Sequence, residues 1–573
     1  MQKLKLLVPL ALFLSVFFTA CGEDPIPGKG EMADVAFAGR IIDEQGDAVP
    51  DAQVQAGNEL AVTDANGVFR LPPVNALAEH AVISVTKTGY FDFSRAYIVE
   101  DGATQTVTIQ LLQKTQVGSL SATVGGAVDV PGGAKLTFPA NAVTDQNGNA
   151  YAGTVRVFAR YLDPADPNLG LNMPGDLTGI NTAGEEDFLA TYGMIAVEIA
   201  SQGGQKLQIA SGQEVELRMP IPIGQLASAP AEIPLWYYDE HHAHWIEEGK
   251  AQKVGNEYVG KVSHFSFWNC DAPFPLTQLH GQIFLENASQ PLANAVVRLT
   301  MLSNGVSSFG WTDSEGFFGG CIPKDEALRL EVVSPENCAA QVFYTQDIGS
   351  FPGVSTLPPI TIPASAQVPV IKVTGQLLNC AGQPLANGYA KIELGDKKHY
   401  IFPSANGQLD RVIFHCDNSV QTGEVVGYDL TNLLESAPVV FSTPPNAVNV
   451  GNITVCTALA EFIQYTLDGQ LFVKIEPGGG LDVTMTTIAA PDSSDTSIRL
   501  AFENSGQLGI FPISSLLVNL LSFDTQAANT LVTNVTAFGN VGDLMIGTFG
   551  GNFQDFNGAS HTISGSYRVI REW

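Results

Sequence analysis

The sequence predicts an all-β protein built from several β-sandwich domains in series. Charged residues make up only 15% of the 573-residue chain, whereas hydrophobic residues reach 45%. The 57 glycines and 33 prolines suit short strands joined by tight turns. Because one hydrophobic core rarely serves a chain of this length, three to six domains are expected.

Residues 1–20 have the organisation of a secretory signal peptide. Lys3 and Lys5 form a basic start, residues 6–18 form an unbroken apolar run, and small residues follow. The run of about 13 residues is too short for a membrane-spanning helix, which needs roughly 20. Cys21 follows Thr-Ala directly, which resembles the lipobox of bacterial lipoproteins. The resemblance implies a diacylated thiol at Cys21, and an ordinary cleaved signal peptide is the alternative.

The next segment, residues 21–35, is rich in Gly, Pro and Glu and is expected to be a tether. Its residues Gly22-Glu-Asp24 resemble the acidic export tag of Bacteroidota surface lipoproteins. Several acyl chains hold a protein stably on a membrane. We therefore expect a lipid-anchored cell-envelope protein, on the outer membrane and exposed at the cell surface.

The charge of the chain argues against nucleic acid as a partner. The net charge is −30, and it becomes −32 once Lys3 and Lys5 leave with the signal peptide. Such a surface repels phosphate backbones and anionic lipid head groups.

One sequence pattern occurs three times, at 36–112, 276–364 and 370–456. Each copy predicts two strands joined by a turn, followed by a hairpin whose turn contains Asn66-Gly67, Glu315-Gly316 or Asn406-Gly407. The glycine supplies the positive φ of a tight turn, and the Phe or Leu two residues later is expected to return to the core. The pattern resembles the carboxypeptidase regulatory-like domain, a small transthyretin-like or Ig-like sandwich. This resemblance implies a spacer or binding platform without peptidase residues. We call the copies the first, second and third units.

A different domain is expected at 115–270, the middle domain. Residues Val130–Val143 (VPGGAKLTFPANAV) resemble the β domain shared by netrin receptors, ankyrins and zonula-occludens proteins. Three later blocks are similar to cartilage intermediate layer protein and its bacterial relatives, namely Thr191–Ile199, Pro234–Glu240 and His264–Cys270. The resemblance implies an extracellular or scaffold role. Residues 457–573, the C-terminal domain, show strand-like alternation without a chemical motif.

The cysteines after Cys21 are even in number, which favours disulfides in an exported chain. They are Cys270, Cys321, Cys338, Cys380, Cys416 and Cys456. We expect all of them to be oxidised, and the sequence does not choose among the pairings. No C-x-x-C pair occurs, which argues against a zinc ribbon.

His264-Phe265-Ser266 is the sharpest chemical candidate. The same tripeptide is the self-cleavage site in certain nucleoporins and in autoprocessing death-domain scaffolds. A serine hydroxyl beside a histidine base could cleave the Phe265–Ser266 bond if that bond were strained. The favoured interpretation is a final strand of the middle domain, with alternate residues in the core.

Two groups of residues have side chains that could bind a metal ion or could simply be solvated. His242 and His244 would share a strand face with Asp239 or Glu240 and could bind a transition metal, but they also fit a solvated hairpin tip. Loop carboxylates suit Ca²⁺, which takes six to eight oxygen ligands. The candidates are Asp163, Asp166 and Asp176, and a solvated acidic surface is the favoured interpretation of them.

No H-E-x-x-H, G-x-S-x-G, Walker or dinucleotide-binding motif occurs in the sequence. We therefore expect a non-enzymatic envelope lipoprotein that displays a rod of β-sandwich domains for adhesion, scaffolding or ligand binding, and no resident cofactor. The partner would be an extracellular protein or a glycan. The alternatives are a glycan-binding lipoprotein in nutrient uptake, using Trp236, Tyr237 and Tyr238, and a protein that cleaves itself at Ser266.

Overall fold

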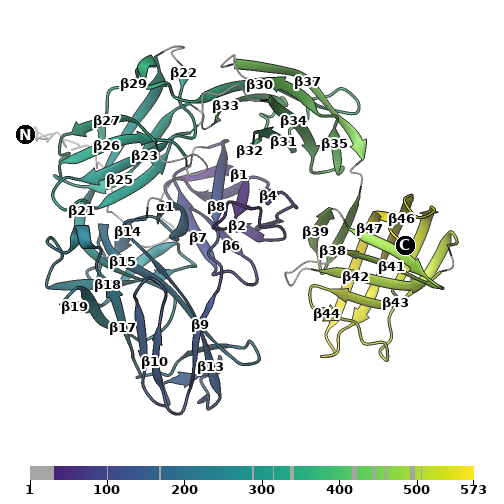
Figure 1. Cartoon of the computed structure of the whole chain (residues 1–573), viewed down its shortest axis with the longest axis horizontal. Coiled ribbons are helices and arrows are strands. Elements are labelled where there is room, and N and C mark those ends of the chain that lie inside the picture. Colours follow the sequence, from purple (N-terminus) through teal and green to yellow (C-terminus); the bar gives the residue numbers. More distant parts are fainter. Residues whose placement is uncertain are drawn as a thin grey trace, which may run out of the picture.

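A computed structural model describes residues 31–573, apart from 100, 167–168, 287–289, 314, 336–340, 396, 416–421, 443–446, 459–460, 476, 491–496 and 505. The protein is nearly all β, as predicted, and its strands form several separate sheets. The first unit lies at the centre of the molecule, with the other parts of the chain around it (Figure 1). Among the described residues, no helix is long and apolar enough to span a membrane.

The first unit packs two four-stranded sheets face to face. One sheet has the order β4-β1-β5 with β8 beside β1, and the other has the order β3-β2-β6-β7. Its strands are β1 (Met32–Ile42), β2 (Gln53–Ala56), β3 (Glu59–Val62), β4 (Val68–Arg70), β5 (Val74–Leu77), β6 (Ala81–Thr86), β7 (Phe93–Tyr97) and β8 (Thr104–Gln110). Alternate residues of β6 are buried, as expected for a strand with one face in the core.

The middle domain continues into the second unit through one long strand, β21 (Phe267–Leu285). The boundary expected between 270 and 276 therefore falls inside a strand. The other elements are β9 (Gln116–Ser121), β10 (Gly126–Asp129), β11 (Lys135–Phe138), β12 (Val143–Thr144), β13 (Thr154–Leu162), α1 (Leu169–Asn172), β14 (Thr178–Ile180), β15 (Glu186–Ser201), β16 (Lys206–Ile209), β17 (Val215–Pro220), η1 (Ile223–Gln225), β18 (Glu232–Asp239), β19 (His244–Val254) and β20 (Glu257–Val262).

In the second unit, β21 pairs with β25 and, in parallel, with β28 and β29. A second sheet has the order β24-β23-β26-β27. The elements are β22 (Gln290–Pro291), β23 (Val296–Met301), β24 (Ser307–Trp311), β25 (Phe317–Pro323), β26 (Leu328–Val333), β27 (Val342–Ile348), β28 (Ser355–Thr356), β29 (Ile360–Ile362) and η2 (Ala364–Ala366).

The third unit and the C-terminal domain follow. The third unit contains β30 (Val370–Asn379), β31 (Gly388–Leu394), β32 (Lys397–Ile401), β33 (Gln408–Phe414), β34 (Thr422–Asp429), β35 (Leu434–Ser436), β36 (Val439–Ser442) and β37 (Ala447–Ala458). The C-terminal domain contains β38 (Phe462–Leu467), β39 (Gln470–Ile475), β40 (Gly478–Asp482), β41 (Met485–Ala490), β42 (Ile498–Glu503), β43 (Gly509–Val518), β44 (Leu521–Ser522), β45 (Val532–Phe538), β46 (Leu544–Gln554) and β47 (Ser560–Arg571).

The three units share the structure that their common sequence pattern predicts. In each unit the first strand pairs in parallel with a late strand, as β1 with β8, β21 with β29 and β30 with β37. The hairpin glycines have positive φ, and a Cβ on any of them would lie 2.4–2.5 Å from a carbonyl oxygen of the first strand. These glycines are Gly67, Gly316 and Gly407. The residue two positions later is buried in every unit, as predicted: Phe69, Phe318 and Leu409.

Candidate functional site: the central cavity and its interfaces

A cavity of about 2000 Å³ lies between the first unit, the middle domain, the second unit and the third unit. We call it the central cavity. Its volume exceeds the roughly 300–1,000 Å³ of an ordinary small-molecule site. The lining mixes titratable, polar and aromatic side chains, among them Arg40, His80, Glu186, His244, Trp311 and His399. The first unit forms one wall of the central cavity. Polar contacts hold this unit against the middle domain, the third unit and the C-terminal domain.

Arg95 on β7 fastens the first unit to the middle domain. Its guanidinium donates to the carbonyl oxygens of Gly170, Met173 and Gly175 at 2.7, 2.8 and 2.9 Å. Arg95 is 8% exposed. A buried guanidinium needs acceptors for its donors, and the short segment around α1 provides them as backbone carbonyls.

The neighbouring Ser94 joins the same interface. Tyr238 Oη donates to the carbonyl oxygen of Ser94 at 2.7 Å, and Ser94 Oγ donates to the carbonyl oxygen of Glu240 at 2.7 Å. Burial raises the pKa of Tyr238 far above its usual range, so the phenol remains a donor. Both side chains are fully desolvated, which makes these bonds costly to break.

The predicted hairpin tip is solvated at His242, whose side chain is 56% exposed, and forms a domain contact at the half-buried His244. The His80 ring of the first unit stacks on the His244 ring with centroids 4.1 Å apart, and His80 Nε2 lies 2.7 Å from the carbonyl oxygen of His242. A carbonyl oxygen only accepts, so that nitrogen carries a proton. Burial, together with His80, lowers the pKa of His244 to about 4. The neutral ring of His244 therefore suits a stacked interface.

The first unit meets the third unit through Tyr389. Tyr389 Oη donates to Asp64 Oδ2 at 2.8 Å and accepts from Asn66 Nδ2 at 2.9 Å. Burial raises the pKa of Asp64 to about 6, with hydrogen bonds opposing the shift. Beside this contact, the Arg40 guanidinium lies 4.6 Å from the centre of the Tyr400 ring, a cation–π geometry.

The first unit also contacts the C-terminal domain. Lys474 on β39 forms an ion pair with Asp51, and their side chains are 7% and 0% exposed. Val62 of β3 packs against the core of the C-terminal domain. The sequence predicts domains in series, but it does not predict these contacts between domains that are distant in sequence.

Glu186 gives the central cavity an unusual acid. Burial raises the pKa of Glu186 to about 7, and the nearby Asp176 carboxylate adds to the shift. Both residues line the cavity. Its wall next to the middle domain therefore gains negative charge around neutral pH.

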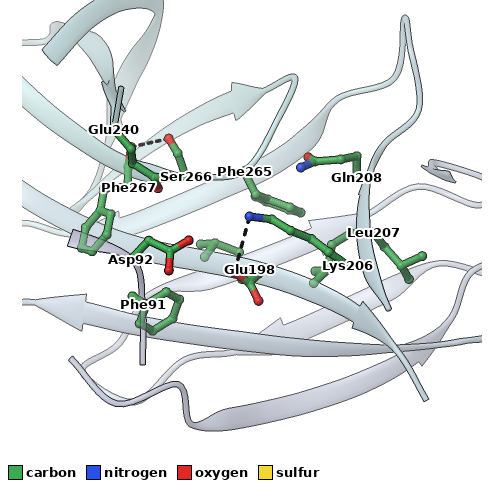
Figure 2. Close-up of a pocket in the computed structure, with 12 residues that line it drawn as sticks. Phe91, Asp92, Glu198, Lys206, Leu207, Gln208, Glu240, Phe265, Ser266 and Phe267 are labelled. Atoms are coloured by element: carbon green, nitrogen blue, oxygen red, sulfur yellow. Dashed lines mark hydrogen bonds and ion pairs between the residues drawn. The ribbon is translucent and has the colours of Figure 1, made fainter. Parts of the chain in front are cut away.

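His264 and Ser266 do not form a nucleophile–base pair in this structure. Ser266 Oγ donates to the carbonyl oxygen of Phe267 at 2.9 Å, whereas the His264 ring packs on Tyr237 and Trp268 at 4.6 and 5.0 Å. Figure 2 shows Ser266 beside Phe267 and Glu240, at the edge of a pocket of about 20 Å³. That volume accommodates about one water molecule. An intact Phe265–Ser266 bond stays the prediction, and self-cleavage at Ser266 stays the alternative.

Carboxylates of the acidic loops accept hydrogen bonds from residues that are close by in sequence. Asp163 Oδ1 accepts from the Ala165 amide at 2.9 Å, and Asp176 Oδ1 accepts from the amide and hydroxyl of Thr178 at 3.1 and 2.7 Å. Within the described part of the chain, no three or more His, Cys, Asp or Glu side chains are grouped so that they could hold a metal ion. The structure thus does not assemble Asp163, Asp166 and Asp176 into a Ca²⁺ site.

The cysteines follow the expectation in part. Cys380, the residue directly after β30, forms a disulfide with Cys456 on β37, with Cα atoms 4.9 Å apart. Cys270 is an exception and the prediction is wrong there: its thiol is free and buried in the core of the middle domain. Cys321 lies half-buried on β25. Cys21, Cys338 and Cys416 lie outside the described residues.

The aromatic strand expected to stack on sugars is largely core. Trp236 is 0% exposed and Tyr238 is 2% exposed. Tyr237 is half-buried against His264 and Trp268. A glycan surface at these three residues is therefore excluded in this structure.

Comparison with known proteins identifies one domain. Residues 36–112 match the carboxypeptidase regulatory-like domain. The match covers the first unit, so the domain at the centre of the molecule is of this regulatory-like type. Its polar residues Asp64, His80 and Arg95 serve the interfaces described above.

Curated relatives resemble part of the chain. Mouse cartilage intermediate layer protein 2 is 25% identical over 228 residues, covering 38% of this chain and 19% of that protein. Pig cartilage intermediate layer protein 1 is 29% identical over 149 residues, covering 24% of this chain and 25% of that protein. The chain therefore spans a quarter or less of these relatives.

Solved structures share only β-rich character. The shaft pilin SpaA of Lactobacillus rhamnosus GG aligns with 32% of this chain and 98% of that chain, at 10% identity and a TM-score of 0.17. The Bacillus anthracis TIE protein aligns with 74% of this chain and 51% of that chain, at 8% identity and a TM-score of 0.15. Likenesses this low carry no functional argument.

Proposed function

We propose that this protein is a non-enzymatic cell-envelope lipoprotein, anchored through Cys21, that displays a fixed arrangement of β domains for adhesion, scaffolding or ligand binding. One observation carries the proposal: the central regulatory-like domain directs its polar side chains into interfaces with three other parts of the chain. Arg95, Tyr389 and Lys474 each hold one of these interfaces.

Residue chemistry supports a structural role over a catalytic one. Two side chains of types that often act as bases or acids are engaged in contacts between domains. His80 stacks on His244, and Asp64 accepts from Tyr389. A scaffold needs such contacts because loosely linked domains would move independently.

The anchor is tested by Cys21→Ala. Acylation requires that thiol, so we expect the variant to leave the membrane fraction, and protease treatment of intact cells should release wild-type peptides from 36–573. Thr19→Ala is the matched control, because it keeps a small residue before the cysteine and should remain membrane-bound. Quantitative retention of Cys21→Ala with membranes contradicts the lipoprotein assignment. Protection of the wild type from protease contradicts surface display.

A glycan ligand in the central cavity is the second candidate. The cavity places the aromatic side chains of Trp311, Phe317 and Tyr400 among polar groups such as Gln278 and Thr108, and Phe317 is 52% exposed. Aromatic faces with a few polar groups are a common lining of ligand sites. Titration of purified protein with neutral hexasaccharides should change tryptophan fluorescence, and Trp311→Ala should abolish the change. An equal response in Trp311→Ala places the sugar elsewhere.

A further inference from the structure

One end of the C-terminal domain gathers exposed apolar side chains from separate loops. Val483 is 86% exposed, Leu508 63% and Val541 60%. Val483 occupies the turn between β40 and β41, Leu508 the connection from β42 to β43, and Val541 the connection from β45 to β46. Scattered exposed apolar residues are normal on a protein, whereas a group of them marks an interaction site.

The strand register places these loops together. Met485 pairs with Glu503, and the Asn504 amide donates to the Thr484 carbonyl oxygen at 2.7 Å, so the Val483 turn adjoins the Leu508 connection. Gly509 pairs with Val535, which sets the end of β45 beside the same connection. The Val541 loop follows directly from that strand end.

Trp573 and Ile510 extend the same surface. The Leu481 amide donates to the Trp573 carbonyl oxygen at 3.1 Å, and the Gly542 amide donates to the Arg571 carbonyl oxygen at 2.8 Å. Trp573 is 48% exposed, and Ile510, two residues after Leu508 on β43, is 70% exposed. We define the apolar tip as Val483, Leu508, Ile510, Val541 and Trp573.

The rim of the apolar tip is acidic. Four exposed carboxylates alternate with its apolar residues along the loops, namely Asp482, Glu503, Asp543 and Glu572. The basic side chain next to them is Arg571, which donates to the carbonyl oxygens of Gly539 and Trp573 at 3.0 Å. The acids therefore keep an outward negative charge around an apolar centre.

We propose that the apolar tip docks a protein partner whose surface presents an apolar face ringed by Lys and Arg. Charge complementarity selects this occupant, because an acidic rim repels anionic lipid head groups and a second copy of a chain with net charge −30. An apolar centre within a polar rim is also the usual anatomy of a protein interface. This proposal rests on the proposed display function, because it states the chemistry of the partner that the displayed protein would bind.

The test uses the purified full chain and amphipathic helical peptides of 18 residues as probes. A Leu/Lys peptide should bind, whereas a Leu/Glu peptide and a Ser/Lys peptide should not, because each lacks one half of the proposed complement. Val483→Ser/Leu508→Ser/Val541→Ser should weaken Leu/Lys binding at least tenfold. These side chains are exposed, so the triple variant should keep the wild-type circular dichroism and unfolding curve.

The opposite end of the same domain supplies the matched control. Leu520 is 62% exposed and Phe556 is 71% exposed, and the bridge between Phe523 and Asp555 places their turns together away from the apolar tip. Leu520→Ser/Phe556→Ser should leave Leu/Lys binding unchanged. Equal loss in both variants, or Ser/Lys binding as tight as Leu/Lys binding, overturns the proposal. Co-sedimentation with phosphatidylcholine vesicles that the triple variant abolishes would assign the tip to membranes instead. Because no step uses the anchor, failure here is distinguishable from failure of the Cys21 experiment.

Discussion

Replacing Asp271 by asparagine should change how the stability of the middle domain depends on pH. The Asp271 side chain is fully buried, and burial raises the pKa of this carboxyl well above its usual range. Asn269 Nδ2 donates to Asp271 Oδ2 at 2.5 Å, whereas Oδ1 accepts no hydrogen bond among the described residues. The environment therefore favours the neutral acid.

The size of the effect follows from proton linkage. The folded state keeps a proton that the unfolded chain releases above about pH 3.9. Stability is fully present below that pH and falls by about 1.4 kcal/mol for each pH unit until the folded-state pKa is passed. The wild type should therefore be less stable at pH 7 than at pH 4, by an amount set by how far burial raises the folded-state pKa of Asp271. Asp271→Asn removes this titration, so its loss over the same interval should be smaller by that amount.

Urea unfolding of the full chain at pH 4 and pH 7 measures the difference. Trp236, Trp245 and Trp268 are fully buried in the middle domain, so tryptophan fluorescence reports mainly on its unfolding. Asp129→Asn serves as the control, because the Asp129 side chain is 85% exposed and should leave the pH dependence unchanged. The reasoning fails if the unfolding free energy of Asp271→Asn drops between pH 4 and pH 7 as much as that of the wild type. It also fails if the substitution lowers the unfolding free energy more at pH 7 than at pH 4.

Three other variants probe the interfaces, the disulfide and the serine. Arg95→Met should weaken the docking of residues 169–176 by about 3 kcal/mol, because three buried carbonyl oxygens lose their hydrogen-bond donor. Amide hydrogen exchange in residues 169–176 should therefore rise, whereas Arg40→Met should leave that exchange unchanged. Cys380→Ala should lower the unfolding free energy by about 4.5 kcal/mol, given the sequence separation of 76 residues, and reduced wild type should match it in urea. Wild type and Ser266→Ala should both run as one intact chain, and two wild-type bands would contradict this.

The sequence predicted the features that depend on neighbouring residues. A hairpin glycine supplies the positive φ of the turn, and the apolar residue two positions later faces the core. Gly67 and Phe69 therefore predict a turn and a core position from three consecutive residues. Strand alternation and glycine-rich turns likewise gave the all-β class. These signals are local, because the backbone conformation of a turn is set by the residues in it.

The interfaces escaped prediction because their partners are distant and often have no side-chain signature. Arg95 contacts carbonyls about 80 residues away, and Tyr238 donates to a carbonyl 144 residues away. A backbone carbonyl is present at every residue, so nothing in the sequence marks Gly170 or Gly175 as its partner. The stacking of His80 on His244 escaped prediction for the same reason, because His80 belongs to another domain.

The scarcity of cations shapes how the domains come together. The chain carries 28 Lys and Arg against 58 Asp and Glu, so neighbouring domains repel one another unless each interface limits its carboxylates. A cation lies at each of three contacts of the first unit: its own Arg95 on carbonyl oxygens, its own Arg40 on the Tyr400 ring, and Lys474 of the C-terminal domain on Asp51. Arg95 and Arg40 have neutral partners, so their positive charges are not neutralised by an ion pair. They therefore lower the net negative charge of their interfaces. Exposed carboxylates lie on outer surfaces such as the rim of the apolar tip, where a basic partner can meet them.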